Sequence, residues 1–227
     1  MESSIKNLKN KIGASLACAD QLNLSKEIDQ LIEAGIDFLH IDIMDGIYVN
    51  NYCFGTQLFD YLKRYKILEI DVHLMVVDPY YKIDFFKNIN FKRLSFHIET
   101  CKNPIQTIDK IKKKGIECGI ALNVSTSHNI LEYLYNDIDY VMIMAVEAGF
   151  AGQDFRESTI DKVRIIREEF SNRKMNKDIY VDGHIDFYTI SKLFKAGANV
   201  FIGGTAGIFN GKNSYRENIL RLRNAFN

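Results

Sequence analysis

An alternation of strand-like and helix-like segments, repeated eight times, constrains the fold of this chain more than any other feature. Short apolar runs lie at 12–16, 38–43, 68–74, 93–98, 117–122, 139–144, 179–181 and 199–202. Apolar residues recur at helical spacing between runs, as over 24–32 and 160–170, and Gly35, Gly115 and Gly197 mark expected helix ends. Eight such units without a linker or low-complexity segment predict an α/β protein, a single (β/α)8 TIM barrel over residues 1–227.

An open, doubly wound sheet is the alternative fold. It usually needs fewer strand–helix units, and no G-x-G-x-x-G motif follows the first apolar run. The barrel is therefore the favoured prediction.

The charge and cysteine content limit the partners of the chain. Lys and Arg together number 29, as do Asp and Glu, so no net field favours nucleic acid or a membrane surface as a partner. No apolar run approaches the roughly 20 residues of a membrane span, and the opening MESSIKNLKN has no apolar signal core. The four cysteines show no C-x-x-C spacing, which predicts reduced thiols in a cytoplasmic protein. A homo-oligomer is the default expectation.

Two strand-like segments carry the same chemistry in inverted order: His40-Ile41-Asp42-Ile43-Met44 and Asp71-Val72-His73-Leu74-Met75. Side chains alternate between the two faces of a strand, so the His, Asp and Met of each segment share one face and the aliphatic residues share the other. We expect Asp71, which lies lower in the barrel, to be structural.

Other polar residues also lie at the C-terminal ends of the predicted strands, where barrels carry their chemistry. Ser15 lies near the end of the first run, Met144 ends the sixth, and Asp182 directly follows the seventh. A lone inward histidine is more often a hydrogen-bonded core residue than a ligand, and a lone methionine is more often core packing. The set of His40, Asp42, His73 and Asp182 is different, because four ionisable groups in one barrel mouth are costly to bury without a metal or one another. The two carboxylates could equally move protons.

Three glycine-rich segments follow consecutive predicted strands. They contain Gly149, Phe150, Ala151 and Gly152 after the sixth, Gly183 and His184 after the seventh, and Gly204 and Thr205 after the eighth. A single cluster of this kind is more often just a turn. Three clusters in the half of the barrel that frequently binds phosphate through backbone N–H groups favour a phosphate site.

The chain resembles the ribulose-phosphate 3-epimerase family along nearly its whole length. The resemblance is carried, in order from Ile12 to Phe209, by IGASLACAD, HIDIMDGIYVNN, DVHLMVVDP, ALNVST, GFAGQ, VDGHI and GGTAGIF. It implies a TIM barrel of the ribulose-phosphate-binding type, one divalent metal ion, and C3 epimerisation of a small-molecule ketose phosphate. Mixed imidazole and carboxylate ligands suit Zn, Fe(II), Mn or Co, and the sequence does not choose among them.

The resemblance also implies roles for individual residues. His40, Asp42, His73 and Asp182 resemble the metal ligands, and Asp42 and Asp182 also resemble the two acid/base residues. The substrate pocket would include Ser15, Met44, His73, Met75 and Met144. The phosphate would be held by Gly149, Phe150, Ala151, Gly152, Gly183, His184, Gly204 and Thr205.

Three departures from the usual pattern bear on the substrate. The chain has E-A-G-F-A-G-Q where the family usually has N-P-G-F-G-G-Q, V-D-G-H for V-D-G-G, and G-T-A-G-I-F for G-S-A-x-F. The chain more closely resembles the D-allulose-6-phosphate 3-epimerase branch in four features. These are the first and third of these departures, the presence of a residue other than glycine after V-D-G, and the motif S-L-x-C-x-D that begins at Ser15. His184 itself matches neither pattern well. The sequence thus favours D-allulose 6-phosphate, with D-ribulose 5-phosphate as the alternative.

Two other functional classes stay open on this architecture. A phosphosugar lyase of related barrels uses D-x-K-x-x-D, but the stretch from His40 to Asp45 has no lysine, and no strand end offers one for a Schiff base. A silent sugar-phosphate binder would be marked by loss of a ligand or an acid/base residue, and all are present.

Overall fold

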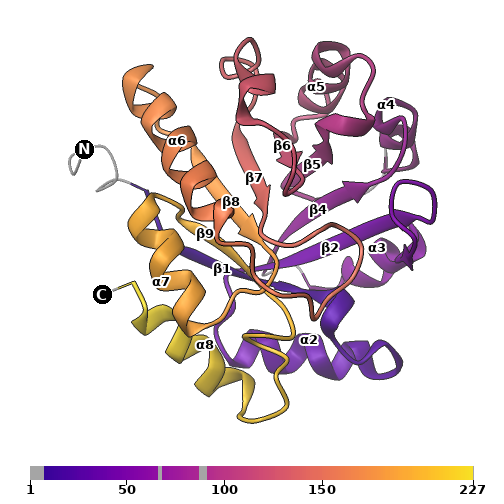
Figure 1. Ribbon diagram of the computed structural model, residues 1–227. Coiled ribbons are helices and arrows are strands. Elements are labelled where there is room, and N and C mark those ends of the chain that lie inside the picture. Colours follow the sequence, from indigo (N-terminus) through magenta and orange to yellow (C-terminus); the bar gives the residue numbers. More distant parts are fainter. Residues whose placement is uncertain (1–7, 66–67, 87–90, 227) are drawn as a thin grey trace.

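The computed structural model of the chain describes residues 8–65, 68–86 and 91–226. The opening residues 1–7, which carry most of the segment searched for a signal core, lie outside them. Figure 1 shows strands in the centre and helices around them. The described residues include no helix that is both long and apolar enough to cross a bilayer.

Eight parallel strands close into a barrel, which confirms the predicted fold. They are β1 (Lys11–Ser15), β2 (Phe38–Asp45), β4 (Glu69–Met75), β5 (Arg93–His97), β6 (Glu117–Leu122), β7 (Tyr140–Met144), β8 (Asp178–Asp182) and β9 (Val200–Gly203). Each pairs with its neighbours in this order, and β1 pairs with both β9 and β2, so the sheet has no open edge here. This closure excludes the doubly wound alternative. The short β3 (Tyr52–Cys53) pairs antiparallel with the end of β2.

The helical segments that follow the strands are unequal in length. The α-helices are α2 (Leu24–Glu33), α3 (Gln57–Leu62), α4 (Pro79–Lys82), α5 (Pro104–Lys112), α6 (Ser158–Asn172), α7 (Phe187–Ala196) and α8 (Tyr215–Asn224). The 3-10 turns are η1 (Leu16–Cys18), η2 (Gln21–Asn23), η3 (Ile83–Phe86), η4 (Ile98–Thr100) and η5 (His128–Leu131). Between β6 and β7 the connection contains only η5, where eight equal strand–helix units would place an α-helix.

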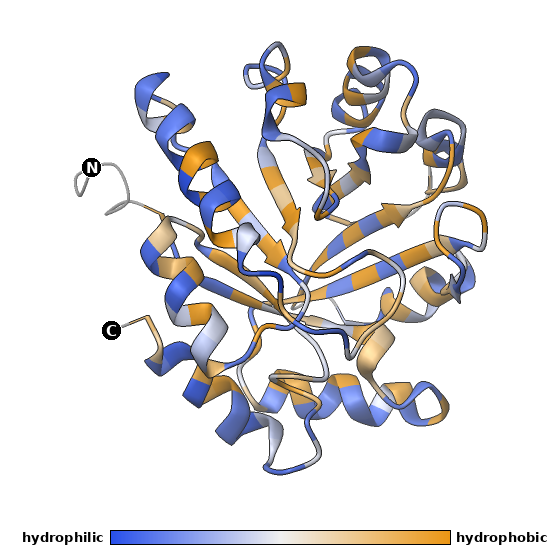
Figure 2. Ribbon diagram, viewed as in Figure 1, coloured by the Kyte–Doolittle hydropathy of each residue, from blue (hydrophilic) through white to orange (hydrophobic). Residues whose placement is uncertain are grey.

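The alternation of side chains along the strands builds two separate cores. Ile41, Val72 and Leu74 face outward and pack with the helices in one continuous cluster. Phe38, Tyr140 and Tyr180 face inward and belong to a smaller cluster that fills the barrel. Figure 2 shows the resulting mixture of hydrophobic and hydrophilic residues along each strand and each helix. The barrel is therefore filled beneath its mouth, so that any ligand must bind at the strand ends.

Charged residues occupy the opposite, N-terminal end of the barrel. The buried guanidinium of Arg93 donates from Nε to Glu117 at 3.0 Å and from Nη2 to Glu69. All three residues begin their strands. The two carboxylates balance the buried positive charge of Arg93. We therefore interpret the charged residues at this end of the barrel as structural.

Two glycines inside the barrel make room for the rings of Tyr140 and Phe38. A Cβ built on Gly119 would lie 2.3 Å from the Tyr140 ring, and one on Gly13 would lie 2.3 Å from the Phe38 ring. Both rings are fully buried or nearly so. Neither ring can therefore move aside without disturbing the packing around it.

We expect Gly119→Ala to lower the free energy of unfolding by about 1–3 kcal/mol, because the added methyl group overpacks the barrel against Tyr140. Urea denaturation followed by circular dichroism measures this change. The matched control is Gly55→Ala, since the Cβ there would meet only the flexible Gln57 side chain. Equal stability of the two variants would contradict the packing argument.

Candidate functional site

The pairing of β2 with β4 brings the two inverted segments together. In the ladder His40 lies opposite Asp71, and Asp42 lies opposite His73. Each imidazole thus has a carboxylate as its direct cross-strand neighbour, on the face that points into the barrel. The inverted order of the two segments therefore places an imidazole beside a carboxylate at two positions of the ladder.

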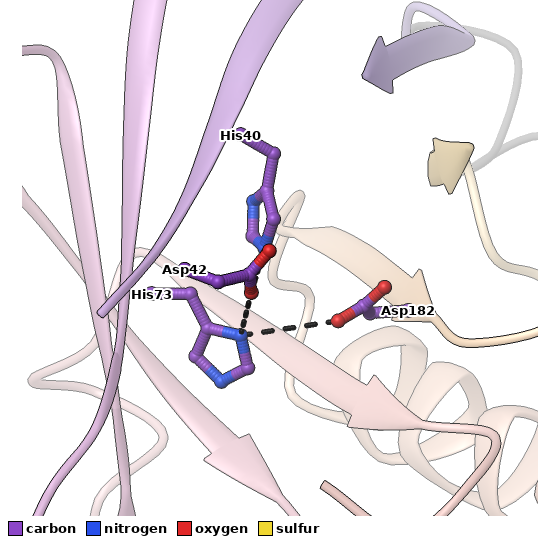
Figure 3. A group of neighbouring side chains, drawn as sticks. All are labelled: His40, Asp42, His73 and Asp182. Carbon is purple, nitrogen blue, oxygen red and sulfur yellow. Dashed lines mark ion pairs between the residues drawn. The ribbon is translucent and has the colours of Figure 1, made fainter. Parts of the chain in front are cut away.

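Asp182, at the end of β8, completes a compact cluster with His40, Asp42 and His73. Their potential ligand atoms all lie within 4.8 Å of one another. The Oδ1 atom of Asp42 is 3.3 Å from His40 Nε2 and 3.4 Å from His73 Nδ1. The same His73 nitrogen is 3.9 Å from Asp182 Oδ2. Figure 3 shows Asp42 and Asp182 approaching His73 from different strands.

The outer side of His40 is held by a direct carboxylate partner. Its Nδ1 is 2.7 Å from Asp71 Oδ2, and the other Asp71 oxygen accepts a hydrogen bond from the Tyr140 hydroxyl at 3.1 Å. The carboxylate accepts from Nδ1–H of His40, so Nε2 is the nitrogen of His40 that points into the cluster. The expected structural role of Asp71 thus includes orienting His40.

The outer side of His73 is held differently, by a second imidazole. Its Nε2 is 3.0 Å from Nε2 of His97, the last residue of β5. Nδ1 of His97 is in turn 2.9 Å from the Tyr48 hydroxyl and 3.2 Å from Glu99 Oε2. Burial lowers the pKa of His97 to about 4 despite its hydrogen bond to Glu99, so the ring is neutral.

The inward atoms of the cluster fit a bound divalent cation. Among the described residues, seven buried side-chain polar atoms lack a hydrogen-bond partner. Three of them are His40 Nε2, Asp42 Oδ1 and His73 Nδ1, which converge on one space. Unpartnered buried polar atoms are costly, and imidazole nitrogens with carboxylate oxygens suit a transition-metal ion. The cluster is therefore a possible metal site.

The two carboxylates of the cluster are electrostatically unequal. Burial raises the pKa of Asp182 to about 6, and the negative charge of Asp42 adds to the rise. Burial alone would also raise the pKa of Asp42, but His40 and His73 hold it well below its usual range. Ser15 Oγ also donates to Asp42 Oδ2 at 2.7 Å. The pair thus offers one carboxylate that stays ionised and one that accepts a proton more readily.

A cavity of about 280 Å³ opens above the cluster at the C-terminal ends of the strands. Asp42 and Asp182 form part of its wall, whereas His40 and His73 are fully buried beneath it. The other sequence-predicted residues that line it are Ser15, Met44, Met75, Met144, Gly149, Phe150, Ala151, Gly152, Gly183, His184, Gly204 and Thr205. The structure thus brings every predicted site residue to one cavity or directly below it.

The β7–α6 loop forms one side of the cavity and is tied at several points. The Gln153 side chain donates to the carbonyl oxygens of Glu147 and Phe150, which closes the loop on itself. Asn51, after β2, donates to the Gly149 carbonyl at 2.8 Å. These bonds hold the glycine-rich segment across the mouth rather than free in solvent.

His184 ties the loop after β8 to the same segment. The Nδ1–H of His184 donates to the Gln153 carbonyl at 2.6 Å, and the Thr189 hydroxyl of α7 donates to the His184 backbone carbonyl at 2.8 Å. The backbone of His184 is left-handed, with φ of 49°. This conformation costs a non-glycine residue roughly 1–2 kcal/mol, which explains why a glycine is usual at this position in the pattern V-D-G-G.

Gly204, after β9, is part of the cavity wall and lies beside Cys18. A Cβ there would lie 3.1 Å from Cys18 Sγ, and the backbone is not left-handed. The requirement for glycine is therefore close approach, not an unusual φ. Burial raises the pKa of Cys18 to about 11, so its thiol stays protonated.

Several residues of the site were not predicted from the sequence. Cavity-lining residues without a prediction are Ala17, Cys18, Val146, Glu147, Gln153, Ile202 and Ala206. His97, Glu99 and Tyr48 support His73 from outside the cavity. The one available signal was the H-x-E spacing of His97 and Glu99 at the end of a predicted strand.

Known proteins resemble the chain in sequence and in fold. A sequence model described as the ribulose-phosphate 3 epimerase family matches residues 11–209. The ribulose-phosphate 3-epimerase of Methanocaldococcus jannaschii is 36% identical over 215 residues, which cover 95% of this chain and 90% of that protein. The ribulose-phosphate 3-epimerase of Bacillus subtilis is 34% identical over 198 residues, covering 86% and 91%.

The solved structure of 3-keto-L-gulonate-6-phosphate decarboxylase from Vibrio cholerae matches with a TM-score of 0.72 at 12% identity, covering 96% of this chain and 98% of that one. At this identity the likeness shows the shared barrel fold alone. The family match and the identities together carry the assignment: the chain is an isomerase-class epimerase that belongs to the ribulose-phosphate 3-epimerase family.

Proposed function

We propose that the chain interconverts the C3 epimers of a ketose phosphate with a divalent metal ion, and that D-ribulose 5-phosphate and D-xylulose 5-phosphate are its substrates. The observation that carries the proposal is the convergence of two carboxylates and two imidazoles at the floor of a cavity walled by glycine-rich loops. The names of the relatives, at up to 36% identity, support the pentulose.

His40, Asp42, His73 and Asp182 would hold the cation. When bound, it would act as a Lewis acid that stabilises the negative charge developing beside the substrate carbonyl, an effect worth several kcal/mol.

The two aspartates would move the protons. One carboxylate removes the C3 proton, the electrons of the C–H bond pass into the adjacent carbonyl system, and the other carboxylate delivers a proton to C3 from the opposite side. Asp42 on β2 and Asp182 on β8 come from strands separated by β1 and β9, so they reach a bound ligand from different directions. Solvent exchange then restores the starting protonation of the two groups. General acid–base catalysis of this kind contributes typically about 10²–10⁴-fold.

The remaining cavity residues would bind the substrate without reacting. Ser15 orients Asp42 through its hydrogen bond. Met44, Met75 and Met144 give uncharged walls that tolerate the flattening of the sugar at C3. Backbone N–H groups at Gly149 to Gly152, Gly183, His184, Gly204 and Thr205 would hold the phosphate group.

D-Allulose 6-phosphate is the second candidate substrate. Ala151, His184 and Thr205, where the chain departs from the usual family pattern, all line the cavity. A hexulose has one more carbon between C3 and the phosphate, and these loops are where the difference in length would be accommodated.

His40→Ala or His73→Ala should reduce bound metal to a small fraction of wild type and lower kcat/KM by at least about 100-fold, because each variant removes an inward nitrogen ligand. Elemental analysis of the purified proteins measures the metal. His128→Ala is the matched control, since His128 lies in η5 outside the cavity. Full metal content in both site variants would remove these histidines from the ligand set.

Asp42→Asn and Asp182→Asn should each lower net epimerisation by about 10²–10⁴-fold, while the remaining carboxylate still exchanges the C3 proton of one epimer with solvent. Proton NMR in D₂O on each epimer measures the exchange, using samples whose metal content has been matched. The two variants should exchange different epimers. Exchange of the same epimer by both variants contradicts the two-base scheme, and no exchange even in the wild type would indicate a silent binder.

Wild-type protein loaded with metal should show a kcat/KM for D-ribulose 5-phosphate at least tenfold above that for D-allulose 6-phosphate. Coupled assays on both phosphates measure the ratio. A preference for D-allulose 6-phosphate would instead establish the second candidate. In that case the combined Ala151→Gly, His184→Gly and Thr205→Ser variant should move the ratio toward the pentulose.

A further inference from the structure

His73 and His40 differ in the hydrogen-bond partner of the ring nitrogen that points away from the cluster. His40 meets an acceptor-only carboxylate, whereas His73 meets the Nε2 atom of His97 at 3.0 Å. Of two imidazole nitrogens that face each other, one must donate and the other must accept. The direction of this single bond therefore decides which nitrogen of His73 carries its proton.

The direction depends on what His97 meets at its other nitrogen. If Nδ1 of a neutral His97 is protonated, its Nε2 accepts from His73 Nε2–H and leaves His73 Nδ1 bare toward Asp42 and Asp182. If Nδ1 is unprotonated, Nε2–H of His97 donates, and the proton of a neutral His73 lies on Nδ1, where it blocks a cation. The partners at Nδ1 are the Tyr48 hydroxyl at 2.9 Å and Glu99 Oε2 at 3.2 Å.

Glu99 and Tyr48 differ in which protonation of His97 Nδ1 they are compatible with. A hydroxyl can donate or accept, so Tyr48 is compatible with either direction, whereas an ionised carboxylate can only accept. Burial would raise the pKa of Glu99, but hydrogen bonds that include the one from His97 lower it to about 2, so the carboxylate is ionised. Glu99 is also fixed in place, because its Oε1 accepts from the Asn123 backbone N–H at 2.7 Å and from the Thr126 hydroxyl.

We propose that Glu99 is a positioning residue for the candidate metal site, and that it acts through His97 to keep the His73 proton on Nε2 and His73 Nδ1 bare. The inference rests on the proposed function in so far as the bare nitrogen serves a cation. The chain of donors runs from His73 to His97 to Glu99, from β4 through the end of β5 to η4. Glu99 is not among the residues that line the cavity, and it is not one of the four clustered residues.

The surroundings of Glu99 make Glu99→Gln a directed test. The Asn123 backbone N–H is only a donor, so it selects the amide oxygen of the new glutamine for the position of Oε1. The amide NH₂ then faces His97 Nδ1 and donates to it. We expect this near-isosteric variant to move the His97 proton from Nδ1 to Nε2 and so reverse the chain.

The primary measurement is long-range ¹H–¹⁵N NMR of the metal-free protein with ¹⁵N-labelled histidine, which reports the protonated nitrogen of each ring. The His97 proton should lie on Nδ1 in the wild type and on Nε2 in Glu99→Gln. Tyr48→Phe is the matched control, because it removes the other partner of the same nitrogen and should leave the proton on Nδ1. A wild-type His97 protonated at Nε2, or a proton that moves in Tyr48→Phe, would overturn the inference even if Glu99→Gln did not fold.

The second measurement is the affinity for Zn²⁺ alone, by competition with a chelator. It should fall about 10–100-fold in Glu99→Gln and change less than threefold in Tyr48→Phe. Unchanged affinity in a Glu99→Gln protein whose His97 proton has moved would contradict the link to the metal site. A different outcome would contradict the proposed function and not this inference. It is a His73→Ala protein that retains its metal, together with a wild-type His97 proton that lies on Nδ1 as expected.

Discussion

The register between β2 and β4 is the constraint on which the rest of the site depends. It sets His40 opposite Asp71 and Asp42 opposite His73, and it also sends Ile41 and Val72 outward into the helix-facing core. A slip of one residue would turn the ionisable side chains of one strand outward and its aliphatic side chains into the barrel. The hydrophobic burial that stabilises the barrel therefore also fixes the order of the site.

Burying His40, Asp42 and His73 together is costly, and the surrounding residues hydrogen-bond only to their outward atoms. Asp71 accepts from His40, His97 pairs with His73, and Ser15 donates to Asp42. Each of these partners satisfies an outward atom and leaves an inward atom of the same side chain without a hydrogen bond. At the N-terminal end of the barrel, Arg93 bonds directly to Glu69 and Glu117, although its Nη1 lacks a hydrogen-bond partner. The inward nitrogen and oxygen atoms of the cluster at the mouth are thus available to bind a ligand such as a cation.

The sequence predicted most of what depends on periodicity. The apolar run at 117–122 coincides with β6, and each of the other seven predicted runs overlaps its strand with ends that differ by no more than two residues. The alternation of side chains was sufficient to place His40, Asp42 and His73 on one face. What it could not supply were contacts between distant loops, such as those from Tyr48 to His97 and from His184 to Gln153. A lone histidine such as His97 has no periodic partner, so its role appears only when β4 and β5 are paired.

The same distinction explains why the substrate is harder to derive than the reaction. The cluster sits on strand ends whose positions are fixed by backbone ladders on both sides. The glycine-rich side of the cavity, where we propose that the phosphate binds, is built from loops that are held by side-chain bonds such as those of Gln153, Asn51 and His184. A change in substrate length must therefore be accommodated in the loops, because moving a strand would disturb both cores. His184 is central to this, since it occupies a left-handed backbone position that disfavours its side chain and gains in exchange a bond that draws the β8 loop toward the β7–α6 loop. In the proposed function, a few replaceable side chains would therefore set the distance from the cluster to the phosphate, whereas the residues proposed to act at C3 are held by the barrel strands.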